Sequence, residues 1–82
     1  MEDRWFKEIV HQGTQFLITK GTGEDMYVQI EFRFEGSFYV CTQEYTNTME
    51  MDGCFDQIDV DDCFNLIIGI RAGTIRGKHS DN

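Results

Sequence analysis

The sequence predicts an α+β fold, a three-stranded antiparallel β-meander with an N-terminal and a C-terminal helix packed on one face. Residues 26–33 alternate strictly between apolar and polar side chains, as in a half-buried strand. A β-branched and aromatic run precedes them, and another follows a Glu-Gly turn. Apolar residues at helical spacing lie at both ends of the chain. A chain of 82 residues suits one small domain, and we expect a loose polar tail from about residue 76.

The first predicted element is an amphipathic helix from Asp3 to Gln12. Four apolar side chains at i, i+1, i+4 and i+5 would form one stripe: Trp5, Phe6, Ile9 and Val10. An acidic start suits the positive end of the helix dipole. Gly13 follows as a C-cap, so we expect the helix to end there.

Two strands are predicted next, at Thr14–Lys20 and Met26–Arg33, joined by a turn at residues 21–25. For the hairpin that follows, the sequence favours a three-residue loop, Phe34–Gly36, with the glycine left-handed. This register would bury the same side of both strands. The residues expected to point inward are Ile30, Phe32, Phe38 and Val40.

The opposite side of this hairpin is predicted to point outward. Its members are Tyr27, Gln29, Glu31, Arg33, Ser37, Tyr39, Cys41 and Gln43. Two interpretations stay open: a solvated sheet face, which antiparallel sheets commonly have, or a contact surface anchored by the tyrosines.

The second half of the chain predicts a loop or a single helical turn at 46–53, then a helix within residues 58–73. Asp59 suits the N-cap, and Asp61 and Asp62 suit the first turn. Gly73 can stop the helix. Gly69 in the interior leaves helix or strand open for residues 65–70.

The three cysteines, Cys41, Cys54 and Cys63, are an odd number, and we expect reduced thiols acting as small hydrophobic residues. The N-terminal stretch has no apolar core of a secretion signal, and no apolar run approaches the length that spans a bilayer. These features predict a cytoplasmic protein without membrane contact.

No motif in the sequence names a reaction, so we expect no enzyme and no cofactor. "GTGEDM" lacks the third glycine of a nucleotide-binding loop and leads into a strand. The spacing of His11, His79 and the cysteines matches no zinc site. The acidic stretch around Asp59 could chelate a hard cation weakly, but helix capping explains it without an ion, so no metal site is predicted.

The distribution of charge is the most informative feature. The net charge is −8, and residues 34–70 contain eight acidic side chains and no Lys or Arg. The rest of the chain is balanced, with seven acids and seven bases. Folding should therefore produce one negative lobe. Such a lobe disfavours direct binding to nucleic acid and suits a basic protein groove.

These observations predict a small non-catalytic inhibitor or immunity-type protein that blocks a basic surface of a nuclease or other nucleic-acid-binding protein. The predicted contact residues are Glu44, Glu50, Asp52, Asp56, Asp59, Asp61 and Asp62, with Tyr39 and Tyr45 as anchors. The alternative is a self-associating or adaptor domain, including a homodimer, that uses the tyrosine-bearing sheet face.

Two resemblances accompany this prediction. A helix, three antiparallel strands and a helix in a very acidic chain resemble some phage-encoded anti-CRISPR proteins, which implies antiviral-defence inhibition by nucleic-acid mimicry. "GCFD" (Gly53 to Asp56) is similar to a short stretch of the cloacin-type colicin immunity proteins, which are also small and acidic. The rest of the chain departs from that family in element order, so no functional residue is carried over.

Overall fold

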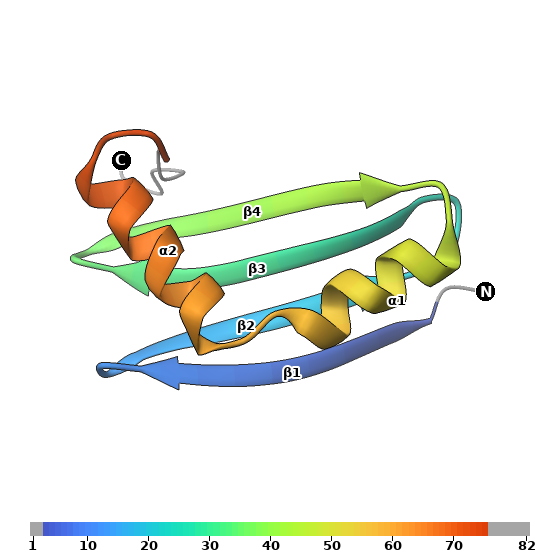
Figure 1. The fold of residues 1–82 in the computed structure, drawn as a ribbon, viewed down its shortest axis with the longest axis horizontal. Helices are drawn as coiled ribbons and strands as arrows, with labels where there is room; N and C mark the ends of the chain where they lie inside the picture. The colour runs from blue at the N-terminus through green and yellow to red at the C-terminus, as the bar shows by residue number, and fades with distance from the viewer. Residues whose placement is uncertain (1–2, 76–82) are drawn as a thin grey trace.

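The protein, described by a computed structural model over residues 3–75, is an antiparallel sheet followed by two helices (Figure 1). The elements are β1 (Arg4–His11), β2 (Thr14–Gly21), β3 (Met26–Phe34), β4 (Ser37–Tyr45), α1 (Thr48–Gln57) and α2 (Val60–Arg71). The four strands lie in the order β1-β2-β3-β4, an up-and-down meander. The α+β class is confirmed, but the predicted three strands and N-terminal helix are wrong. The predicted loose tail lies outside the described residues.

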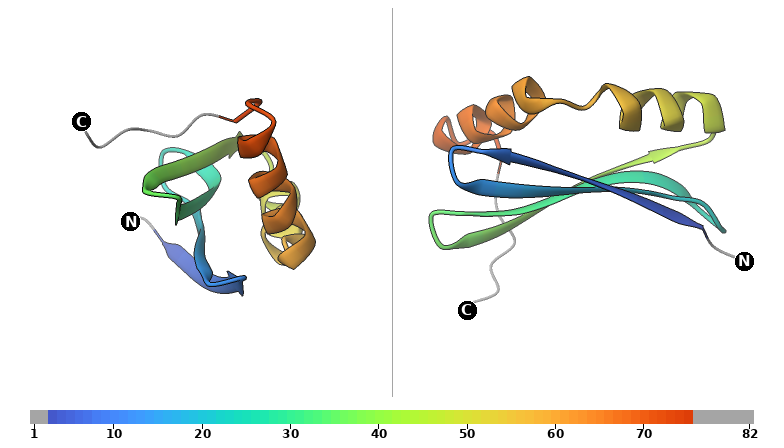
Figure 2. Two further views of the ribbon diagram at one scale, coloured as in Figure 1. Left: turned by 90° about the vertical axis from the view of Figure 1, so that its left-hand side faces the viewer. Right: turned by 90° about the horizontal axis from the view of Figure 1, so that it is seen from below.

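Both helices cover the same face of the sheet and leave the other face open (Figure 2). The described chain is a flat body of 35 × 28 × 20 Å. Both helices follow the last strand, because the chain completes the meander before it crosses over the sheet (Figure 1). We refer to α1 and α2 as the helix layer and to the uncovered side of the sheet as the open face.

The segment predicted as the N-terminal helix is the edge strand β1. A tight turn with positive φ at Gln12 and Gly13 joins it to β2, so Gly13 is a hairpin residue and not a helix cap. The stripe of apolar residues that suggested a helix is also compatible with a strand, because aromatic and β-branched residues favour strands. In the sheet, alternate residues of β1 face the helices and the solvent.

The predicted register of the β3–β4 hairpin is wrong by one residue. Glu35 and Gly36 form a two-residue turn, both with positive φ, which matches the twist of the flanking strands. Phe32 therefore pairs with Tyr39. The shift turns Tyr39, Cys41 and Gln43 toward the helices, and it moves Phe38 and Val40 to the open face. The inward placement of Ile30 and Phe32 is confirmed, and so is the left-handed glycine.

The stretch predicted to be irregular forms α1, which starts where the Asn47 side chain accepts a hydrogen bond from the Glu50 amide. The predicted second helix is confirmed as α2, and residues 65–70 are helical. Asp59 is its N-cap, and Gly73, with φ of 80°, follows its last turn. Thr74 and Ile75 fold back by donating their amides to the Gly69 carbonyl. Ile75 packs closely over the Cα of Gly69, which explains a glycine inside this helix.

The core lies between the sheet and the helix layer. Its buried members are Phe16, Ile18, Val28, Phe32, Tyr39, Met51, Phe55, Cys63 and Ile67. Three rings form a row across the sheet, with centroids 4.5 Å apart for Phe16–Phe32 and 5.2 Å apart for Phe32–Tyr39. Offset aromatic contacts of this kind add stability beyond the buried area.

Among residues 3–75, no helix is both long and apolar enough to cross a membrane.

Cys63 gives a prediction about stability. All three cysteines are free thiols, and Cys63 is fully buried on the side of α2 that faces the core. Burial first, and then Asp62 and Asp59, raises the pKa of Cys63 from 9.0 to about 11. The unfolded chain loses this proton at lower pH than the folded chain, so stability should fall by roughly 2 kcal/mol between pH 9 and 11. Urea unfolding at pH 8 and pH 11 measures the fall, and Cys63→Ala should reduce it.

Candidate binding surfaces

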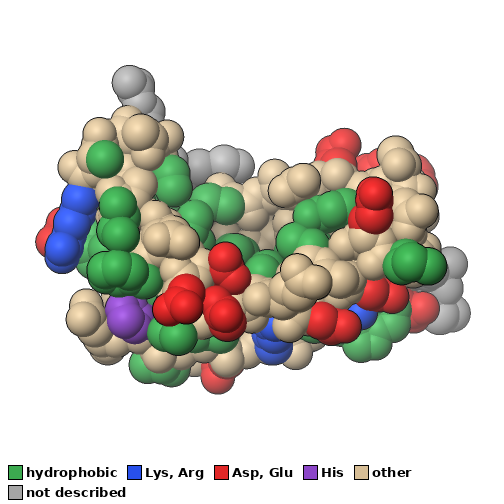
Figure 3. All heavy atoms as spheres, viewed as in Figure 1, with side chains coloured by type: hydrophobic (Ala, Val, Ile, Leu, Met, Phe, Trp, Pro, Cys, Tyr) green, Lys and Arg blue, Asp and Glu red, His purple; other side chains and the backbone are tan. Residues whose placement is uncertain are grey.

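The structure brings six of the predicted contact residues together on the helix layer. Glu50, Asp52 and Asp56 lie on α1, while Asp59, Asp61 and Asp62 lie at the start of α2. All except Asp52 are exposed. Figure 3 shows the acidic side chains spread over this face. Glu44 is separate from them, because it lies opposite Tyr27 on the open face.

Two lysines approach the helix layer from the sheet beneath it. Lys20 Nζ lies 2.8 Å from Asp52 Oδ1 and packs between the rings of Trp5 and Phe55. Lys7 Nζ donates to the Ile58 carbonyl oxygen at 2.9 Å, at the end of α1 where the helix dipole is negative. Lys20 forms an ion pair with Asp52, while Lys7 bonds to backbone carbonyl oxygens, so the two side chains pair directly with one of the six carboxylates.

The first turn of α2 combines a structural role with surface charge. Asp59 accepts hydrogen bonds from the Asp61 and Asp62 amides, and the Asp62 carboxylate accepts one from the Asp59 amide. This reciprocal arrangement is a capping box. Asp61 takes part in the capping box only through its backbone amide, and its side chain is exposed.

The two predicted tyrosine anchors have different environments. Tyr39 is 8% exposed and belongs to the core, so its predicted place on an outer surface is wrong. Tyr45 is half-buried at the end of β4. A hydrogen bond with Cys54, followed by burial and the charge of Glu50, raises the pKa of Tyr45 to about 12. Its hydroxyl therefore stays protonated to higher pH than that of an ordinary tyrosine, whose pKa is about 10.

An apolar stripe on α2 was missed by the sequence analysis. Val60, Phe64 and Ile68 are 43%, 44% and 47% exposed, and their spacing of four residues places them on one side of the helix. The Phe64 ring contacts His11 at the end of β1, with centroids 5.6 Å apart. Figure 3 shows hydrophobic side chains along α2 beside the acidic groups. The spacing was visible in the sequence, but which side of α2 faced the sheet was not.

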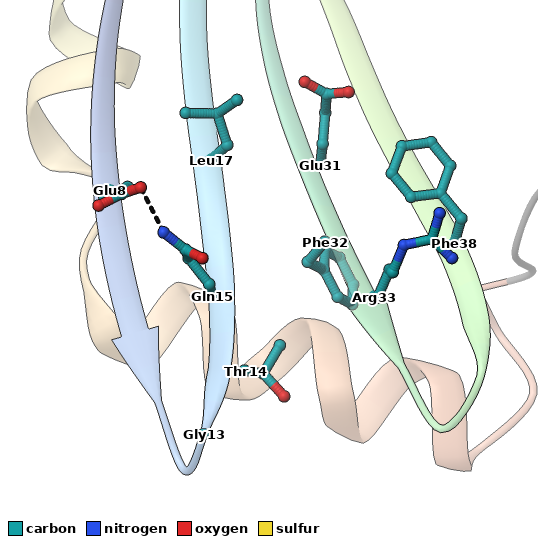
Figure 4. A pocket seen from close by; sticks show the side chains of 9 residues that line it. All are labelled: Glu8, Gly13, Thr14, Gln15, Leu17, Glu31, Phe32, Arg33 and Phe38. Atoms are coloured by element: carbon teal, nitrogen blue, oxygen red, sulfur yellow. Dashed lines mark hydrogen bonds between the residues drawn. The ribbon is translucent and has the colours of Figure 1, made fainter.

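The open face carries a hollow of about 510 Å³ at the end of the sheet near the two tight hairpins (Figure 4). The β2–β3 ladder stops at Leu17 and Glu31, although both strands continue beyond these residues. Thr14–Phe16 and Phe32–Phe34 remain paired only within their own hairpins, so the hairpins diverge. Side chains of both hairpins line the gap: Glu8, Thr14, Gln15, Leu17, Glu31, Phe32, Arg33 and Phe38.

Charged and apolar groups alternate around this hollow. Glu8 and Glu31 both lie opposite Leu17 on neighbouring strands. Gln15 Nε2 donates to the Glu8 carboxylate. The Arg33 guanidinium lies 5.4 Å from the centre of the Phe38 ring. The hollow thus offers an apolar floor between two carboxylates and one guanidinium.

Within residues 3–75, no three His, Cys, Asp or Glu side chains converge in a geometry that could hold a metal ion.

Comparisons with protein families, with curated proteins and with solved structures found no match for this chain.

The double role of Asp59 predicts different results for two substitutions. Asp59→Ala removes the cap and should lower the free energy of unfolding by about 1 kcal/mol. Asp59→Asn removes the charge but keeps a side chain that caps equally well, so stability should change little. Urea unfolding of both variants tests this. An equal loss of unfolding free energy in the two variants would show that the charge of Asp59, and not its capping hydrogen bonds, stabilises the protein.

Proposed function

We propose that this protein is a non-catalytic inhibitor or immunity-type binding protein that occupies a basic surface of its partner. The partner class is a nuclease or another nucleic-acid-binding protein, whose phosphate-binding groove the acidic helix layer would fill. No direct contact with nucleic acid is part of the proposal, because like charges repel.

The observation that supports this proposal is the separation of charge between the two sides of the protein. Six carboxylates lie on the helix layer, and Arg71, at the end of α2, is the first basic residue after Arg33. In contrast, the open face mixes both signs, with Arg33 near Glu31 and Glu8. An acidic layer of this kind raises the association rate with a basic groove by steering.

The apolar stripe of Val60, Phe64 and Ile68 supports the same surface for a second reason. Charge complementarity contributes mainly speed and specificity, while affinity comes largely from desolvated apolar anchors. Phe64 lies in the same helix as Asp61 and Asp62. A partner could therefore meet both the carboxylates and the stripe in one contact.

A second candidate is a self-associating or adaptor domain that uses the open face. Phe6 and Val10 on the edge strand β1 are 60% and 64% exposed there, which favours this alternative. The acidic layer would then serve only to keep the protein soluble. Sedimentation at micromolar concentration separates the candidates, because a stable homodimer supports the second.

The main proposal is tested by binding to a purified nuclease encoded in the same genomic neighbourhood, across ionic strength. Affinity should fall as salt rises, because the Debye length shortens from about 10 Å at 0.1 M to about 3 Å at 1 M. The variant E50Q/D56N/D61N removes three carboxylates of the helix layer and should weaken binding at least about tenfold.

The matched control is E24Q/D25N/E44Q, which removes the same charge from the β2–β3 turn and the open face. It should change affinity much less than the helix-layer variant. Binding that is indifferent to salt, or equal loss in both triple variants, would contradict a role for the helix layer.

A further inference from the structure

The gap between the two hairpins has a property that the rest of the open face lacks. Elsewhere β2 is hydrogen-bonded on both sides, to β1 and to β3. At Thr14–Phe16 and Phe32–Phe34 the ladder between β2 and β3 is missing, because the paired register of these two strands ends at Leu17 and Glu31. Both rims of the gap therefore present main-chain donors and acceptors that have no partner across it.

The opposite side of the gap is closed, which makes it a hollow and not a passage. Phe16 and Phe32 contact each other across the gap on the helix side, 4.5 Å between ring centroids. Cys63 and Ile67 of α2 belong to the same buried cluster. Figure 4 shows Phe32 at the floor of the opening, between the diverging strands. A ligand can enter only from the open face or from the turn end.

An extended peptide backbone is the ligand that such rims match best. It offers donors and acceptors on both of its edges, at the repeat of a strand. A helix bonds its own backbone groups and would leave the rims unpaired. The volume of about 510 Å³ lies within the range of small-ligand sites.

The side chains around the hollow favour a basic peptide. Glu8 and Glu31 flank Leu17, and Arg33 is the one basic residue among the lining side chains. The guanidinium of Arg33 is held against the Phe38 ring, at the edge of the hollow. A lysine or arginine could lay its methylene stem on Leu17 and its charge beside the two carboxylates.

We propose that the hollow between the β1–β2 and β3–β4 hairpins binds a short, extended, basic segment of the partner as an inserted strand. The proposal rests on the proposed function, since it assigns a second contact of the same basic partner. A second copy of this chain is a poorer occupant, because each copy carries a net charge of −8.

The probe for the test is the peptide acetyl-Lys-Val-Lys-Val-Lys-amide, titrated into the ¹⁵N-labelled protein and followed by NMR. The largest amide shifts should occur at Gln15, Leu17, Glu31 and Arg33. Methylation of the two valine nitrogens removes the donors that face one rim and should weaken binding about tenfold. The variant E8Q/E31Q should weaken binding by a similar factor, about tenfold.

The control variant E24Q/D25N removes the same charge elsewhere and should keep the affinity within about twofold of the original. Shifts confined to the helix layer, or equal affinity of the methylated peptide, would overturn the inserted-strand proposal.

Nuclease binding distinguishes the two proposals. If E8Q/E31Q binds the nuclease normally while E50Q/D56N/D61N does not, the hollow proposal fails and the proposed function stands. If the peptide fills the hollow while nuclease binding is independent of salt, peptide binding by the hollow is supported and the proposed function fails.

Discussion

The contact between Phe16 and Phe32 is the interaction on which the arrangement of the protein depends. It joins the two hairpins on the helix side at the point where their backbone ladder has ended. Tyr39 extends the contact to β4, and α2 lies over the row with Cys63 and Ile67. Aromatic and apolar packing thus closes the core where hydrogen bonding between β2 and β3 does not.

Because the helices cover only one face of the sheet, the protein has two surfaces with different properties. The helix layer is acidic, since α1 and the first turn of α2 supply carboxylates while the nearest lysines lie beneath the helices. The open face is mixed in charge and is indented where the hairpins diverge. Both surfaces are consequences of covering a four-stranded sheet with helices on a single face.

Part of the fold could be predicted locally. The strict alternation of Met26–Arg33 predicted β3, and the capping residue Asp59 with Gly73 predicted the limits of α2, because these patterns depend on neighbours in sequence. The N-terminal segment could not be assigned in this way, since its apolar spacing fits a helix or a strand. This segment is a strand because it pairs with β2 along its whole length.

The order of residues alone places the excess negative charge between residues 34 and 70, and it predicts that the acids around Asp59 start a helix. Which carboxylates share a surface depends on how the chain folds in three dimensions. Glu44 and Glu50 are six positions apart, yet they lie on the open face and the helix layer, because the chain crosses over the sheet between them. The tight turn at Glu35–Gly36 likewise placed Tyr39 in the core, since one residue of register moves every side chain of a strand to the other face.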